Sequence, residues 1–289
     1  MYSFGMKGDF KLLIQLKRAL VCCMTASLIL AGGSELYPVK ADTARDLELR
    51  GPASQGDQAD KKDPFIPAGA ASADLGELRR KYSETFIFRG PEVKQIALTF
   101  DDGPDPRFTP QILDVLHRKG VKATFFVVGA RAKKFPGLLR RMSHEGHLIG
   151  NHSYSHPNFR NRSIKQFQSE ILRTEKIIQN VVGYRPQLIR PPYGEIKEEQ
   201  VKWAKKNGYT LVNWNVDSQD WKGIDENKVI SNVMSTAGPG SIILQHSGGG
   251  VGSDLTGTIQ ALPKIIDALQ AQGYQFVDLS ELLHTTKYR

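Results

Sequence analysis

The chain has 289 residues, 40% of them hydrophobic, and a formal net charge of +9 at neutral pH. This length and hydrophobic content allow one large domain or two small ones with a real core, and they exclude an intrinsically disordered chain. The excess of basic residues is typical of a protein attracted to anionic surfaces. No basic stripe interleaved with aromatic residues is present, so we do not expect nucleic acid as a partner.

Residues 1–41 have the pattern of a secretory signal peptide. Basic residues precede an apolar run over 19–32, and residues 39–41 fit a small-x-small cleavage site. The alternative is an uncleaved membrane anchor, which needs about 20 apolar residues, more than this run supplies. Both cysteines, Cys22 and Cys23, lie inside the run, so the mature chain would contain no thiol and no disulfide.

Residues 42–93 are polar and have few large apolar side chains, so we interpret them as a linker that ends in a short helix near 75–82. From residue 94 onwards, short apolar runs alternate with amphipathic stretches. The seven candidate strands are Gln95–Phe100, Ala123–Val128, His147–Gly150, Gln187–Arg190, Thr210–Asn215, Ser241–Gln245 and Gln275–Val277. The candidate helices are Pro110–Lys119, Phe135–Glu145, Ile164–Val181, Lys197–Asn207, Lys228–Ser235 and Thr258–Gln272. Several helices end at a glycine suited to a C-cap: Gly120, Gly146, Gly208 and Gly273.

Alternation of strands and helices predicts a parallel sheet, in an α/β fold. In a (β/α) barrel, the chemistry gathers at the C-terminal ends of the strands. Polar residues stand at or just after these ends along the chain: Asp101, Asp102, His152, Arg190, Asp217 and His246. We therefore expect them to share one rim of the fold.

Asp101 and Asp102 are adjacent carboxylates, which repel each other unless a cation or a proton compensates. His152 and His156 follow about fifty residues later. One aspartate and two histidines, with a ligand position left open, are typical of a catalytic zinc-type site, and the other aspartate is then free to act as a base. The four-residue spacing lets both imidazoles face one point if the segment forms a helical turn, which Pro157 would end.

At this point the chain resembles the NodB-homology polysaccharide deacetylases, the metal-dependent enzymes of carbohydrate esterase family four, which remove N- or O-acetyl groups from sugars. The resemblance covers about residues 94–284. It rests on five segments in order: Thr99–Pro104, His152–His156, Arg190–Tyr193, Asp217–Trp221 and Leu244–His246. It implies a distorted (β/α) barrel with fewer than eight strands, in agreement with the seven candidate strands, over residues 94–289.

The resemblance implies that Asp102, His152 and His156 hold a divalent metal. Zinc is the default for such a set of ligands, which would also accept cobalt, nickel or manganese. Asp101 is then the general base that takes a proton from water. We expect Arg190 to pair with Asp101 in a bidentate manner and to keep it oriented and ionised.

Two further groups complete the implied mechanism. The backbone N–H of Tyr193 would stabilise the tetrahedral oxyanion, since prolines precede it in that loop. His246 would protonate the leaving amine, with Asp217 or Asp220 as the carboxylate that holds it protonated; we prefer Asp220. The side chains expected to line a small pocket for the acetyl methyl group are Trp221, Leu244 and Pro192.

The sequence therefore predicts an exported, monomeric, metal-dependent hydrolase that removes N-acetyl groups from a cell-wall polysaccharide, with peptidoglycan before chitin-type oligomers. It would be secreted or wall-associated, or bound to the membrane if the N-terminus is not cleaved. One alternative is an O-acetyl esterase of the acetyl-xylan type. Another is a non-catalytic wall-binding module, against which Asp101 and His246 count, because binding alone needs neither a base nor an acid.

Overall fold

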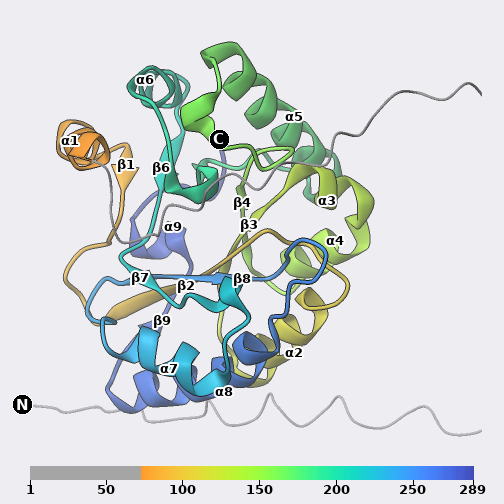
Figure 1. Cartoon of the computed structure of the whole chain (residues 1–289), viewed down its shortest axis with the longest axis vertical. Helices are drawn as coiled ribbons and strands as arrows, with labels where there is room; N and C mark the ends of the chain where they lie inside the picture. The colour runs from red at the N-terminus through yellow and green to blue at the C-terminus, as the bar shows by residue number, and fades with distance from the viewer. Residues whose placement is uncertain (1–72) are drawn as a thin grey trace, which may run out of the picture. The chain divides into compact units, whose positions relative to one another are not determined.

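The structure is a computed structural model that describes residues 73–289 (Figure 1). The signal peptide, its cleavage site, both cysteines and residues 42–72 of the expected linker lie outside the described residues. Among the helices of residues 73–289, none has the length and apolar character needed to cross a membrane.

The strands form a parallel sheet in the order β1-β6-β5-β4-β3-β2-β8-β7, with β9 paired to β2. Their bounds are Phe86–Ile87 (β1), Gln95–Asp101 (β2), Thr124–Val127 (β3), Leu148–Asn151 (β4), Leu188–Ile189 (β5), Thr210–Val212 (β6), Val216–Asp217 (β7), Ile242–His246 (β8) and Gln275–Phe276 (β9). The expected parallel α/β fold is confirmed. Because β1 and β7 do not pair with each other within the described residues, the barrel is open on one side.

The expected strand Thr210–Asn215 is wrong in one respect, because the chain there forms two separate strands, β6 near one end of the strand order and β7 at the other. β6 pairs with β5 and β1, whereas β7 pairs with β8 at the far end of the order. Residues 213–215 bridge the gap: the N–H of Asn213 donates to Ile87 O at 2.8 Å, and the N–H of Asn215 to Ile242 O at 3.3 Å. Asp217 therefore ends a strand of its own.

The six expected helices are present within two residues of their predicted ends. The helices are α1 (Ala73–Lys81), α2 (Thr109–Lys119), α3 (Gly129–Lys134), α4 (Pro136–His144), α5 (Ile164–Val182), α6 (Glu198–Lys206), α7 (Glu226–Met234), α8 (Thr256–Ala271) and α9 (Leu279–Leu282). The four glycines expected at C-caps all have left-handed φ values, between 65° and 83°. Only glycine adopts this conformation at little cost, which explains why the helices end there.

Strand β2 shows how the core positions the rim. Ile96, Leu98 and Phe100 point into the apolar cluster formed with helices such as α2 and α8. Successive side chains of a strand point to opposite faces, so Thr99 and Asp101 share the other face with Ala97, which packs among the side chains of a separate cluster. The same alternation that buries the outer face thus turns a carboxylate inwards at the end of the strand.

The expected linker boundary at residue 93 is too late. Leu75 and Leu78 of α1 are 4% exposed, and Phe86 of β1 is 1% exposed in the same apolar cluster. β1 also extends the sheet by pairing with β6, and Figure 1 shows α1 beside β1 and α6 near β6. The folded domain therefore begins no later than residue 73, because these side chains belong to its core.

Candidate active site

The five predicted segments meet at the carboxyl ends of the strands. Asp101 is the last residue of β2, and its Cα partner on β8 is His246. Asn151 ends β4 and pairs with Ile189 at the end of β5, so the residues that follow, His152 and Arg190, emerge side by side. Parallel register alone thus gathers groups that are up to 145 residues apart in the chain, as between Asp101 and His246.

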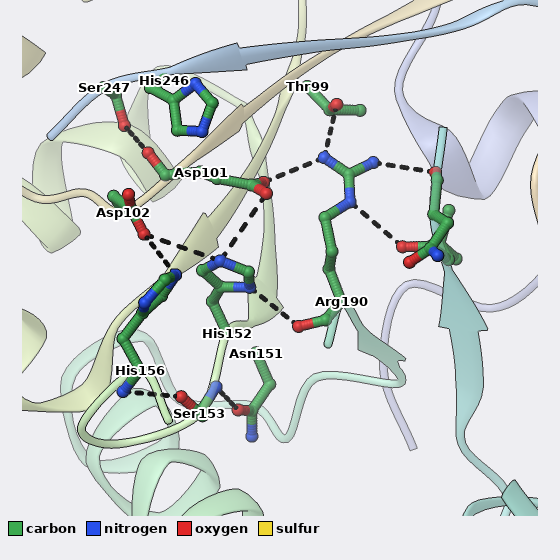
Figure 2. A network of polar contacts seen from close by, with 12 residues as sticks. Thr99, Asp101, Asp102, Asn151, His152, Ser153, His156, Arg190, His246 and Ser247 are labelled. Carbon is green, nitrogen blue, oxygen red and sulfur yellow. Dashed lines mark hydrogen bonds and ion pairs between the residues drawn. The ribbon is translucent and has the colours of Figure 1, made fainter. Parts of the chain in front are cut away.

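Asp102, His152 and His156 turn their ligand atoms towards one another (Figure 2). Oδ1 of Asp102 lies 3.2 Å from Nε2 of His156 and 3.6 Å from Nε2 of His152, and one ligand atom from each residue lies within 4.8 Å of the others. Oδ1 of Asp102 is buried and accepts no hydrogen bond from the described residues. A carboxylate oxygen and two imidazole nitrogens converging in this way fit a divalent cation of the zinc type.

The hydrogen bonding of His152 prepares it to be a ligand. Its Nδ1 lies 2.8 Å from the carbonyl oxygen of Arg190, so Nδ1 carries the proton and donates it. Nε2 is left with its lone pair towards Asp102. Burial lowers the pKa of His152 to about 3, so the ring is neutral. A carbonyl on the far nitrogen of a neutral imidazole is the usual support of a metal-binding histidine.

The segment from His152 to His156 is not the helical turn expected from the sequence. Ser153 and His156 have left-handed φ values of 66° and 59°. Oδ1 of Asn151 accepts the N–H of Ser153, and Oγ of Ser153 accepts the N–H of His156, both at 3.0 Å. Such bonds from short polar side chains to the backbone compete with helix formation. The loop brings the two imidazole centroids within 4.9 Å of each other.

Arg190 is fully buried and contacts Asp101, but the expected bidentate pair is wrong. Nη1 donates to Oδ1 of Asp101 at 2.9 Å and to Oγ1 of Thr99 at 2.7 Å. Nε and Nη2 donate instead to the carbonyls of Val212 and Asn213, at 3.0 and 3.1 Å. The guanidinium donors are divided between the Asp101 side and the backbone because the end of β6 places two carbonyl oxygens close to Nε and Nη2.

The second oxygen of Asp101 is consequently not bound by Arg190. Oδ2 lies 3.6 Å from Nε2 of His152, on the side of the three candidate ligands (Figure 2). Burial raises the pKa of Asp101 above its ordinary value, although the charge of Arg190 opposes this rise.

His246 contacts Asp220 and not Asp217. Its Nδ1 lies 2.7 Å from Oδ1 of Asp220, whereas Asp217 accepts the N–H of Gln219 at 2.8 Å. Burial by itself lowers the pKa of His246, but the charge of Asp220 and the hydrogen bond with it outweigh burial and raise the pKa to about 9. The charges of Asp101 and Asp102 also raise the pKa of His246, so the imidazole is protonated at neutral pH.

Tyr193 lies beside the candidate ligands. Its ring meets that of His156 edge to face at 4.8 Å, and the residue as a whole is 52% exposed. The turn η2 (Pro192–Gly194) that carries it is closed by the N–H of Gly194, which donates to Pro191 O at 3.0 Å. The backbone of Tyr193 is thus held next to the site while its side chain faces solvent.

The three residues expected to line a methyl pocket come from different segments. Leu244 is 3% exposed and pairs in register with Thr99 and Asp217. Pro192 is buried in η2, whereas Trp221 is partly buried in the turn η3 (Asp220–Lys222). A shared pocket stays a prediction.

Two supporting residues had been given no role from the sequence. Thr99 binds Arg190, and its place two residues before Asp101 on the same strand face is a signal that could have identified it. Thr258 of α8 donates to Oδ2 of Asp220 at 2.8 Å. A threonine in a helix carries no such signal, because only the tertiary fold brings it to Asp220.

Left-handed backbone is concentrated in these segments. Six non-glycine residues of the described part have positive φ, and only His284 lies outside the five motifs; the others are Asp102, Ser153, His156, Tyr193 and Gln219. This conformation costs an L-residue roughly 1–2 kcal/mol, so it persists only where surrounding contacts hold it, often at functional sites.

Comparison with known proteins agrees with this geometry. The family model described as polysaccharide deacetylase matches residues 89–212. A peptidoglycan-N-acetylglucosamine deacetylase of Bacillus cereus is 48% identical over 205 residues, which are 71% of this chain and 74% of that protein. The peptidoglycan-N-acetylmuramic acid deacetylase PdaC of Bacillus subtilis is 43% identical over 199 residues, 69% of this chain and 41% of that protein.

Among solved structures, the Bc1960 peptidoglycan N-acetylglucosamine deacetylase superimposes with a TM-score of 0.71 at 46% identity, covering 74% of this chain and 99% of that one. Identity at this level over most of a relative's length indicates common descent and not only a shared fold. The motifs, the open parallel barrel and these relatives lead to one conclusion: the chain belongs to the polysaccharide deacetylases of carbohydrate esterase family four.

Proposed function

We propose that this enzyme is a metal-dependent hydrolase that removes N-acetyl groups from cell-wall polysaccharide, with the N-acetylglucosamine of peptidoglycan as its first substrate. The observation that carries this proposal is that a basic and an acidic group lie on neighbouring strands beside the three candidate ligands. Asp101 is a carboxylate with one oxygen turned towards those ligands, and His246 is a protonated imidazole on the neighbouring strand. A base and an acid on one site are what hydrolysis of an amide requires.

Asp102, His152 and His156 would hold the metal, for which we take zinc as the default, with cobalt, nickel or manganese as substitutes. Two observations support this assignment: Oδ1 of Asp102 accepts no hydrogen bond from residues 73–289, and Nε2 of His152 keeps its lone pair. When bound, such a metal supplies a Lewis acid that polarises the acetyl carbonyl and lowers the pKa of water from about 15.7 towards 7.

Asp101 would take the proton of the attacking water through Oδ2, the oxygen that Arg190 leaves unbound. Arg190 orients the carboxylate through one hydrogen bond to Oδ1. The position of Arg190 is set by Thr99 and two backbone carbonyls. The backbone N–H of Tyr193 would donate to the oxyanion that develops on the acetyl oxygen.

His246 would donate a proton to the leaving nitrogen from Nε2, because Nδ1 is engaged by Asp220. An amine is a poor leaving group until it is protonated, whereas an alkoxide needs less help. A histidine with its pKa raised to about 9 therefore favours N-deacetylation over the O-acetyl esterase alternative.

The two relatives support peptidoglycan and differ in the sugar, since one is named for N-acetylglucosamine and the other for N-acetylmuramic acid. The higher identity and the larger covered share of the first favour N-acetylglucosamine. A positively charged chain suits an anionic wall. We further propose export by the N-terminal segment; a secreted product that begins at Asp42 would support cleavage, and a full-length membrane-bound form would favour the anchor.

Acetate release from defined substrates tests the proposal. The chain without its first 41 residues is incubated with peptidoglycan, chitin oligomers and acetyl-xylan, with metal, with a chelator and after metal is restored. We expect metal-dependent release from peptidoglycan at the highest rate, and loss of that release in Asp101→Asn. Undiminished release in the chelator would contradict metal dependence, and a preference for acetyl-xylan would favour the esterase. Binding to peptidoglycan without acetate release would favour a wall-binding module.

A further inference from the structure

The loop between the two candidate histidine ligands has an unfavourable backbone that neighbouring contacts must hold. Ser153 and His156 both have left-handed φ values. Two bonds inside the loop, from Ser153 N to Asn151 and from His156 N to Ser153, satisfy only part of its backbone. The amides of the two residues between them, Tyr154 and Ser155, have to find acceptors elsewhere.

The acceptor is the side chain of Glu170, in the second turn of α5. Its Oε2 accepts the N–H of Tyr154 at 2.8 Å and that of Ser155 at 2.7 Å, and its Oε1 accepts the hydroxyl of Ser155 at 2.9 Å. Two successive peptide N–H groups aimed at one carboxylate oxygen form charge-assisted bonds, which are about twice as strong as neutral ones.

Other contacts hold the first half of the loop but not the second. The N–H groups of Gly129 and Ala130, at the start of α3, donate to the carbonyls of Ser153 and Tyr154 at 2.9 and 3.0 Å. Among the described residues, every hydrogen bond recorded for Ser155 goes to Glu170. Ser155 directly precedes His156, so Glu170 is the polar anchor nearest to that ligand from outside the loop.

Helix α5 is itself fixed to the strand from which the loop emerges. Nδ2 of Asn151, the last residue of β4, donates to the carbonyl of Ile171 at 2.9 Å. Phe167 and Ile171 are fully buried, so this part of α5 is packed on the core. Glu170 thus connects a helix that is packed on the core to Ser155, the residue before His156.

We infer that Glu170, which lies outside all five motifs, is a positioning residue that sets the affinity of the metal site. This inference rests on the proposed function, because it assumes that Asp102, His152 and His156 bind a divalent cation. Without Glu170, the loop can leave the left-handed conformation, and Nε2 of His156 departs from its place 3.2 Å from Oδ1 of Asp102. Metal binding must then reorder the loop, so the dissociation constant rises.

The test measures affinity and not only activity. Metal-free full-length protein is titrated with zinc in competition with a chromogenic chelator. Loss of a residue that supports a ligand costs about 10- to 100-fold in metal affinity, and we expect this rise in Kd for Glu170→Ala. Glu170→Gln keeps an oxygen for both N–H groups, and its amide can donate to the hydroxyl of Ser155, so it should restore most of the affinity.

The control is Glu199→Ala, which removes an exposed glutamate of another helix, α6, whose side chain makes no hydrogen bond among the described residues. It should leave Kd unchanged. If Glu170→Ala does not fold, as judged by circular dichroism, Glu170→Asp replaces it: the charge stays but the reach is about one methylene shorter, and Kd should again rise.

The outcomes separate the two proposals. If the wild-type chain takes up no zinc, cobalt, nickel or manganese, the metal site is wrong and this inference falls with it. If the wild type binds zinc and the folded Glu170→Ala and Glu170→Asp variants bind it equally well, the metal site stands and the role of Glu170 is refuted.

Discussion

The carboxylate of Asp220 contacts His246 twice, once at the ring and once at the backbone. Oδ1 lies 2.7 Å from Nδ1, and Oδ2 accepts the backbone N–H of the same residue at 2.8 Å. Asp220 is 1% exposed and receives a further bond from Thr258. The carboxylate is therefore fixed in a buried place, where its charge acts on the imidazole with little screening by solvent.

Asp220→Asn should change the pH dependence of N-deacetylation. His246 can donate a proton only below its pKa, so activity falls as the pH rises through about 9. Loss of the Asp220 charge lets burial lower this pKa towards or below its ordinary value of about 6.5, and the alkaline limb moves to lower pH. The rate on an N-acetylated oligosaccharide is measured from pH 5 to 10. Asp217→Asn is the control; a shift there and none in Asp220→Asn would mean that Asp217 is the partner.

His246→Ala should reduce turnover of amides far more than that of activated esters. General acid catalysis contributes roughly 100- to 10,000-fold, and the loss on an N-acetyl sugar should lie in that range. An aryl acetate releases a phenolate that departs without protonation, so the variant should lose much less of its rate on this substrate. Rates on both substrates are compared at the same metal loading. Equal losses would indicate a structural or oxyanion-binding role for His246.

Asp101→Asn and His152→Ala should both abolish activity, for different reasons. The first variant keeps the three candidate ligands and loses the base, so its metal content stays near that of the wild type. The second loses a ligand, so its metal content falls. Metal per chain is measured by elemental analysis after dialysis. Equal metal loss in both would show that Asp101 is a ligand and that the roles of the two aspartates are exchanged.

Asp105 should stabilise the fold across the neutral and mildly acidic range. Its buried carboxylate accepts bonds from Arg107 at 3.0 and 2.8 Å and from Arg131 at 2.8 Å. Burial opposes ionisation, but these arginines outweigh it and lower the pKa to about 2. A lowered pKa means that the stabilisation is complete above the unfolded value of about 3.9 and is lost as the pH falls through about 2.

Asp105→Asn should therefore lower the free energy of unfolding on the order of 2 kcal/mol, by nearly equal amounts at pH 7 and pH 5. Urea unfolding of both proteins at the two pH values checks this. If the two proteins already have the same free energy of unfolding at pH 5, the lowered pKa of Asp105 is contradicted. Asp267→Asn, at a largely exposed pair with Lys119, is the control and should change stability by less than about 1 kcal/mol.

The position of the site on one rim could be predicted because it follows from periodicity, whereas the roles of its residues came from the resemblance to the family. The alternation in β2 turns Asp101 inwards, and parallel strands bring the residues after them to one rim. The choice of Asp220 over Asp217 was a preference from the sequence, and the structure gives the contact to Asp220. The ends of the long helices were predictable for a similar reason, since amphipathic periodicity and glycine caps are local signals.

The rest depends on contacts that no local pattern encodes. β1 and β7 have two residues each, too few for any period. The donors of Arg190 are shared between Asp101 and the backbone because of where the carbonyls at the end of β6 lie. The loop from His152 to His156 takes its shape from hydrogen bonds between side chains and the backbone. The predicted linker boundary was wrong for the same reason, because Phe86 becomes a core residue only through the pairing of β1 with β6.

The left-handed residues of the motifs also bear on laboratory evolution of this enzyme. At Tyr193 and Gln219, with φ of 59° and 57°, glycine would relieve a conformational cost of about 1 kcal/mol or more. A selection for heat resistance alone should therefore accumulate glycine at these positions. Such clones would survive higher temperatures while the turns beside the reacting groups loosen, so heat resistance and turnover should diverge unless acetate release is selected at the same time.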